Sequence, residues 1–140
     1  VTGGCVVSYS PILIDHFRNP RNAGMLRNPD GVGEEEYDGC GDLARFSFRV
    51  TDGRMTDVRF QAYGCGPTIA AASAGSELVR GGLLAGALNL TPEAVEEAVG
   101  GLPPERRHAA QVVVGAIRAA ARDYLRRRDA LKGAGAQQRV

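Results

Sequence analysis

A two-residue turn between two alternating segments constrains this fold more than any other feature of the sequence. Apolar and polar side chains alternate through residues 44–50 and again through residues 57–62. Asp52-Gly53 lies between these segments, and this pair is the strongest short signal for a β-hairpin. Strict alternation places the apolar side chains on one face of each strand. The sequence therefore predicts two antiparallel strands with one buried face.

Signals for helices and for a third strand lie on both sides of the hairpin. Ser10 and Thr91 are capping residues, and each directly precedes a proline, which is favoured in a first helical turn. Glycine pairs at residues 81–82 and 100–101 mark helix ends. A third strand is expected at residues 32–37. The expected helices follow Ser10-Pro11, Cys65-Gly66-Pro67 and Thr91-Pro92, and the last runs from about Glu105 to about Asp129.

The order of these elements, with strands early and helices late, favours one class of fold. It predicts an α+β sandwich, in which a small three-stranded antiparallel sheet carries helices packed on one face. A chain of 140 residues fits a single domain, and no internal repeat or linker divides it. Residues 1–140 are therefore expected to form one domain, with flexible ends at residues 1–7 and 131–140.

Composition excludes several classes of function. A net charge of +1 and an aromatic content of 6% argue against a nucleic-acid partner. No segment approaches the roughly 20 apolar residues of a membrane span, and no signal-peptide pattern is present. Three cysteines cannot form a fully paired disulfide framework, and free thiols fit a reducing compartment. A cytoplasmic location without membrane contact is expected.

Two of the three cysteines lie between glycines, at matching ends of the predicted hairpin. Cys40 precedes the outgoing strand and Cys65 follows the returning strand, so antiparallel pairing brings them side by side. Asp42 is two residues from Cys40 and is expected to point to the same side. His108, near the start of the last helix, is the candidate for a fourth position. Cysteine, histidine and aspartate bind zinc or iron, so these four residues predict a metal site.

The same residues also have other interpretations. A free cysteine is most often a small buried hydrophobic residue. A single histidine in a first helical turn is more often a solvated polar side chain. A hydrolytic site is a further alternative, with Cys65 as nucleophile, His108 as base and Asp42 orienting the base. The residue pattern by itself leaves these alternatives open.

Several motifs between residues 9 and 128 resemble the IscU/NifU-type iron–sulfur cluster scaffold family. The segments DHFRNPRNAG, CGD, FQAYGCGPTIAAASAGSELVRGG and LPPERRHA occur in the order of that family and near its spacing. The resemblance implies a small antiparallel sheet covered by helices on one face. It also implies a scaffold or carrier rather than an enzyme. Such a protein works with a cysteine desulfurase and passes clusters to acceptor apoproteins.

The resemblance assigns ligand roles to the same four residues. The first two cluster cysteines of the family fall on Cys40 and Cys65, its aspartate on Asp42 and its histidine on His108. Its third cysteine falls on Ala109, whose side chain can neither ligate iron nor carry a persulfide. The remaining set can hold iron, a 2Fe–2S cluster with mixed ligation, or zinc in its place. A monomer and a dimer both remain open.

Two departures from the family pattern leave a second function open. The third cysteine is implicated in accepting sulfur from the desulfurase, so Ala109 favours, as an alternative, a zinc- or iron-binding relative that modulates the desulfurase. Residues 102–106 read LPPER where one branch has Leu-Pro-Pro-Val-Lys, which makes recognition by the specialised chaperone doubtful. Cys5 is interpreted as an incidental thiol, and His16 as a packed or surface side chain.

Overall fold

The computed structural model describes residues 9–37 and 41–138. Within these residues the strands β1 (Gly31–Tyr37), β2 (Asp42–Thr51) and β3 (Arg54–Tyr63) form one antiparallel sheet in the order β1-β2-β3. The helices are α1 (Pro11–Arg18), α2 (Gly66–Val79), α3 (Leu84–Leu88), α4 (Pro92–Ala98), the short 3-10 helix η2 (Pro104–Arg106) and α5 (His108–Gln138). The predicted α+β class and three-stranded sheet are confirmed.

The hairpin turn has the conformation that its sequence predicts. Asp52 and Gly53 both adopt positive φ, at 53° and 76°. A type I′ turn requires positive φ at both central residues, and this turn type matches the twist of the flanking strands. Phe46 of β2 pairs with Phe60 of β3, and both side chains are buried. The turn sets the pairing of Thr51 with Arg54, and a register shift between Arg49 and Val50 then brings Phe46 opposite Phe60, so that the apolar faces of the two strands coincide.

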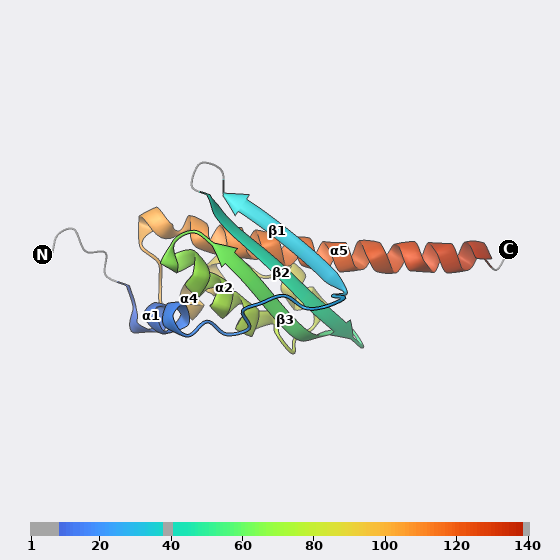
Figure 1. Ribbon diagram of the computed structural model, residues 1–140, viewed down its shortest axis with the longest axis horizontal. Helices are drawn as coiled ribbons and strands as arrows, with labels where there is room; N and C mark the ends of the chain where they lie inside the picture. Colours follow the sequence, from blue (N-terminus) through green and yellow to red (C-terminus); the bar gives the residue numbers. More distant parts are fainter. Residues whose placement is uncertain (1–8, 38–40, 139–140) are drawn as a thin grey trace, which may run out of the picture.

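Helices α2 and α5 lie on the same face of the sheet (Figure 1). α5 contacts β1 and β2, whereas α2 contacts β3 and β2. The short helices α3 and α4 pack against α5, and α4 also contacts α2. Because the first half of α5 has neighbours on several sides, most of its side chains between Ala109 and Ala121 are buried, whereas residues 126–131 are exposed. Val112, Ala116 and Ile117 are all at most 2% exposed.

α5 approaches β1 closely because both elements carry small residues where they meet. A Cβ atom on Gly33 would lie 2.0 Å from the backbone nitrogen of Ala120. A Cβ atom on Gly31 would lie 2.5 Å from the backbone oxygen of Ala120. Any larger side chain would push the helix away from the strand, so these glycines set the spacing between α5 and the sheet.

The segment between α1 and β1 crosses the other face of the sheet (Figure 1). The backbone N–H of Gly24 donates to the carbonyl of Phe60 at 2.7 Å, and that of Leu26 donates to Ser47 Oγ at 3.2 Å. Ser47 is fully buried beneath this segment. Alternation correctly places Ser47 on the face opposite the helices, but only the tertiary structure shows that this face is partly covered.

Two helical segments differ from the sequence prediction. α3 spans five residues, which is too short to show a helical period. α5 continues to Gln138, past the expected end near Asp129. No proline interrupts this part of the sequence, and its alanine, lysine and glutamine residues are good helix formers, although Gly133 and Gly135 are poor ones. The expectation of a flexible end at residues 131–140 stays a prediction. The expectation for residues 1–7 lies outside the described residues.

No helix within residues 9–37 and 41–138 is long and apolar enough to cross a membrane. The longest of them, α5, carries several arginines and aspartates between Arg118 and Asp129.

His16 is a packed residue of α1, which agrees with its interpretation from the sequence. Its Nδ1 lies 2.8 Å from Ser73 Oγ on α2, and its Nε2 lies 3.6 Å from Glu77. The side chain is buried between the two helices. It is therefore part of the contact between α1 and α2.

Candidate metal centre

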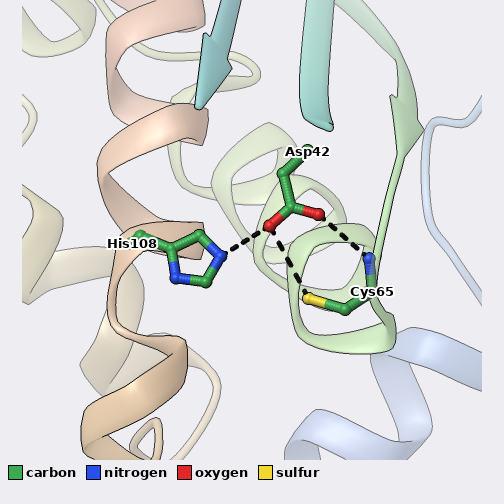
Figure 2. A group of neighbouring side chains, drawn as sticks. All are labelled: Asp42, Cys65 and His108. Carbon is green, nitrogen blue, oxygen red and sulfur yellow. Dashed lines mark hydrogen bonds and ion pairs between the residues drawn. The ribbon is translucent and has the colours of Figure 1, made fainter. Parts of the chain in front are cut away.

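Asp42, Cys65 and His108 meet at one end of the sheet (Figure 2). One ligand atom from each lies within 4.8 Å of the other two. Asp42 is the first residue of β2, Cys65 follows β3 and caps α2, and His108 begins α5. Three separate elements therefore place the three side chains. Cys40, the fourth predicted ligand, lies outside the described residues, as does Cys5, and the ligand roles remain predictions.

The hairpin and a glycine place Asp42 beside Cys65. Leu43 pairs with Tyr63, so Asp42, which precedes Leu43, and Gly64, which follows Tyr63, lie at the same end of the sheet. Gly64 adopts a φ of 129°, which side-chain-bearing residues rarely adopt. A Cβ atom on Gly64 would lie only 1.9 Å from Asp42 Oδ1. Glycine is thus needed at position 64 for both its backbone conformation and the space it leaves to the carboxylate.

Asp42 is the most buried member of the group, at 3% exposure. Its Oδ1 accepts a hydrogen bond from the backbone N–H of Cys65 at 3.2 Å. Its Oδ2 lies 2.5 Å from His108 Nε2 and 3.9 Å from Cys65 Sγ (Figure 2). A buried carboxylate is costly unless such contacts compensate for its lost hydration. The contacts also hold the other two side chains toward one point.

Two sources of positive charge lie near Cys65, whose sulfur also contacts the Asp42 carboxylate. Cys65 is the N-cap residue of α2, where the unpaired backbone N–H groups carry partial positive charge. Arg106 is a second source: its pKa is raised, first by a hydrogen bond with Tyr9 and second by attraction to Cys65. Thr68 Oγ1 lies 3.3 Å from the sulfur, so one hydroxyl group also contacts it.

His108 is held at the start of α5 by its neighbours. Its ring stacks on that of Tyr37, with the ring centroids 4.5 Å apart and an angle of 26° between the planes. Arg107, directly before the helix, forms an ion pair with Glu96 of α4 at 3.0 Å. Ala109 is fully buried in the core. The turn that presents His108 to the site is therefore packed on its other side.

Sequence reasoning did not single out Tyr37 or Thr68, although each carries a positional signal. Thr68 follows Cys65 by three residues at a helix start, a spacing that places two side chains on one face. Tyr37 pairs with Asp42 in the register of β1 and β2. That pairing could be found only once the third strand had a register, which the sequence did not supply.

The donor set fits a transition metal better than it fits a hydrolytic site. A thiol, an imidazole and a carboxylate are typical ligands for zinc and iron. In a hydrolytic arrangement the histidine would contact the cysteine and the aspartate would lie behind the histidine. Here Asp42 lies between Cys65 and His108 instead. His108 is thus not placed as a base for Cys65.

The fold and the site together define an α+β domain with a candidate metal centre at one sheet end. The chain belongs to the NifU-like N terminal domain family, whose model matches residues 8–130. It is 41% identical over 119 residues to "Iron-sulfur cluster assembly scaffold protein IscU 1" of Archaeoglobus fulgidus, covering 85% of this chain and 78% of that protein. It is 38% identical over 122 residues to "Iron-sulfur cluster assembly scaffold protein IscU" of Azotobacter vinelandii, covering 84% and 94%.

A solved structure supports the same fold. The chain resembles the N-terminal part of a nitrogen-fixing NifU-like protein from Brucella abortus, with a TM-score of 0.67 and 19% sequence identity. The match covers 84% of this chain and 94% of that structure. At this identity the likeness shows the fold, and the family assignment rests on the sequence matches above.

Proposed function

We propose that this chain is an iron–sulfur cluster assembly scaffold or carrier, which binds iron or a labile cluster and passes it to apoproteins. The observation that carries the proposal is the convergence of Asp42, Cys65 and His108 within 4.8 Å. The names of the relatives from Archaeoglobus fulgidus and Azotobacter vinelandii support the same activity. The cluster is cargo, which the protein holds and gives away.

The proposed ligands have complementary roles. Cys40 and Cys65 provide thiolates, which bind iron firmly, and His108 provides an imidazole. Asp42 provides a carboxylate, which is a harder ligand than sulfur and is already engaged by His108 and the backbone of Cys65. A mixed set of this kind holds a cluster less firmly than four thiolates would, which suits a carrier. A 2Fe–2S cluster is the proposed cargo, and zinc can occupy the same ligands.

The proposed partners follow from this activity. A cysteine desulfurase would supply sulfur, and acceptor apoproteins would receive the cluster. Cys65 caps the N-terminus of α2, and Arg106 is near enough for its charge to attract that of the Cys65 sulfur. That environment suits a reactive sulfur species bound at Cys65.

A second candidate function is favoured by Ala109. This residue is fully buried and its side chain has no donor atom, and the resemblance to the scaffold family places the third cysteine at this position. A zinc- or iron-binding protein that no longer assembles clusters, and that modulates the desulfurase instead, fits this loss. The two candidates differ in whether a cluster forms on the protein.

Anaerobic reconstitution with iron and sulfide, read by visible absorbance and metal analysis, tests the proposal. We expect wild type to develop a cluster spectrum that is lost in Cys65→Ser and in His108→Ala. Ala109→Cys should raise cluster yield and slow cluster loss. Ala110→Cys is the matched control, because Ala110 is equally buried and adjacent, and it should behave as wild type. A colourless wild type that holds one stoichiometric zinc would favour the modulator instead.

A further inference from the structure

Tyr37 covers one face of the His108 ring. The ring centroids are 4.5 Å apart and the planes are inclined by 26°, which is a stacked arrangement. Tyr37 is the last residue of β1 and pairs with Asp42 in the sheet register. One short stretch of the sheet thus places two groups against His108: a carboxylate on the edge of its ring and an aromatic ring on its face.

These two contacts restrict the imidazole in different ways. The contact between Asp42 Oδ2 and His108 Nε2, at 2.5 Å, fixes where one ring nitrogen lies. A single contact at one atom still permits the ring plane to turn about it. Stacking against a second ring restricts that turn, because aromatic pairs prefer a limited set of relative orientations. Together they define both the position and the plane of the imidazole.

The His108 side chain is largely buried, whereas Tyr37, whose ring covers it, is an exposed residue. Only 11% of the His108 side chain is exposed. Tyr37 therefore lies between His108 and solvent on this side of the site. A ligand atom that must leave a metal by swinging outward would meet the tyrosine ring.

We propose that Tyr37 is a positioning residue for the candidate metal centre: its ring holds the His108 imidazole toward Asp42 and Cys65 and thereby slows the loss of a bound metal ion. The inference rests on the proposed function in that it requires metal binding at this site. Coordination to a cation withdraws electron density from an imidazole, and the electron-rich face of a neighbouring tyrosine favours such a ring. The stack is thus stronger when the metal is bound.

Cobalt retention by the full chain tests the proposal. Co²⁺ is bound to wild type, Tyr37→Phe, Tyr37→Leu and Tyr63→Leu, and its loss to excess chelator is followed by the cobalt–thiolate absorbance. Tyr63 is the matched control, because it also ends a strand and is exposed, at 57%. We expect Tyr37→Leu to lose cobalt about three- to tenfold faster, the range that an aromatic pair contributes. Tyr37→Phe and Tyr63→Leu should match wild type, whereas a wild-type rate for Tyr37→Leu would overturn the proposal.

A measurement on the metal-free chain separates this inference from the proposed function. The NMR signals of the His108 ring protons should be shifted by the tyrosine ring current in wild type and in Tyr37→Phe, and the shift should vanish in Tyr37→Leu. Unchanged signals in Tyr37→Leu would overturn the positioning role. If wild type binds no cobalt but shows the ring-current shift, the metal site and the retention step are refuted, whereas the orientation of His108 by Tyr37 is supported.

Discussion

Asp42 is the residue on which the candidate centre most depends. It contacts the backbone and the sulfur of Cys65 with one carboxylate, and it contacts the imidazole of His108 with the same group. A single side chain therefore orients two ligands from different elements. Asp42 is itself a proposed ligand, so its displacement should lower metal affinity by at least the roughly 10- to 100-fold that the loss of a partner behind a ligand causes. The space for Asp42 depends on the absence of a side chain at Gly64.

We predict that Gly64→Ala lowers cobalt or zinc affinity by at least about tenfold, because the new methyl group would displace the Asp42 carboxylate. Gly24→Ala is the control: Gly24 has a nearly identical φ, 127° against 129°, but no atom within 4 Å of the added Cβ. Both variants should lose stability through backbone strain, by about 1–3 kcal/mol. Metal titration alongside urea unfolding checks this. Equal metal affinities in the two variants would show that the added methyl group at residue 64 does not disturb the Asp42 carboxylate.

At the level of elements, the contact between β1 and α5 decides where His108 lies relative to the sheet. Gly31 and Gly33 of β1 admit the backbone of α5 around Ala120. His108 is the first residue of the same helix, so the spacing of this contact also sets the distance between His108 and the sheet edge that carries Asp42. The close packing of β1 against α5 therefore contributes both to the core and to the position of His108.

Gly33→Ala should destabilise the protein by about 1–3 kcal/mol, since the added methyl group would meet backbone atoms that cannot move separately. It should also weaken metal binding, because α5 must shift as a unit. Gly86→Ala, in α3, provides the contrast: its added Cβ meets nothing within 4 Å, and alanine is the better helix former, so stability should rise by about 0.5–1 kcal/mol. Urea unfolding, analysed with the same m-value for all proteins, measures the change in the free energy of unfolding of both variants. A neutral Gly33→Ala would contradict the close approach of β1 and α5.

At the level of the whole molecule, a buried polar network joins α1, α2 and the segment that crosses the outer sheet face. Ser73 Oγ contacts His16 Nδ1 at 2.8 Å and accepts from the backbone N–H of Arg21 at 2.9 Å. Asn22 donates to Ser76 Oγ at 3.0 Å. The network anchors the start of the crossing segment, so its integrity contributes to the stability of the entire fold.

Stability should fall as the pH drops below about 6.5, and His16 should be one cause. Its pKa is lowered, first by burial and then by the charge of Arg21, which outweigh the attraction of Glu77 and Asp15. The unfolded chain therefore takes up the proton at a higher pH than the folded chain, so this contribution is complete above the unfolded pKa and is lost as the pH falls through the folded one. Urea midpoints between pH 8 and pH 5 should show a smaller acid loss in His16→Gln. An identical pH profile would exclude His16 as a cause.

The sequence by itself determined most of the secondary structure and the placing of part of the site at the hairpin ends, because both are local properties. Alternation and the Asp52-Gly53 turn defined the hairpin, and that hairpin predicted that Cys40 and Cys65 would lie side by side, with Asp42 on the same side. The structure places Asp42 beside Cys65, whereas Cys40 lies outside the described residues. Capping residues before prolines marked the starts of α1 and α4, where Ser10 and Thr91 accept hydrogen bonds as expected. These signals act over a few residues and need no distant partner.

Only the tertiary structure decided what depends on contacts between distant elements. The covering of Ser47, the approach of α5 to Gly33 and the stack of Tyr37 on His108 join residues between 21 and 87 positions apart. Such contacts depend on the register of neighbouring strands and on the distance between α5 and the sheet. No short sequence pattern encodes that register or that distance. His108 was named from the sequence as a candidate ligand, but its distance to Asp42 was set by where α5 packs against the sheet.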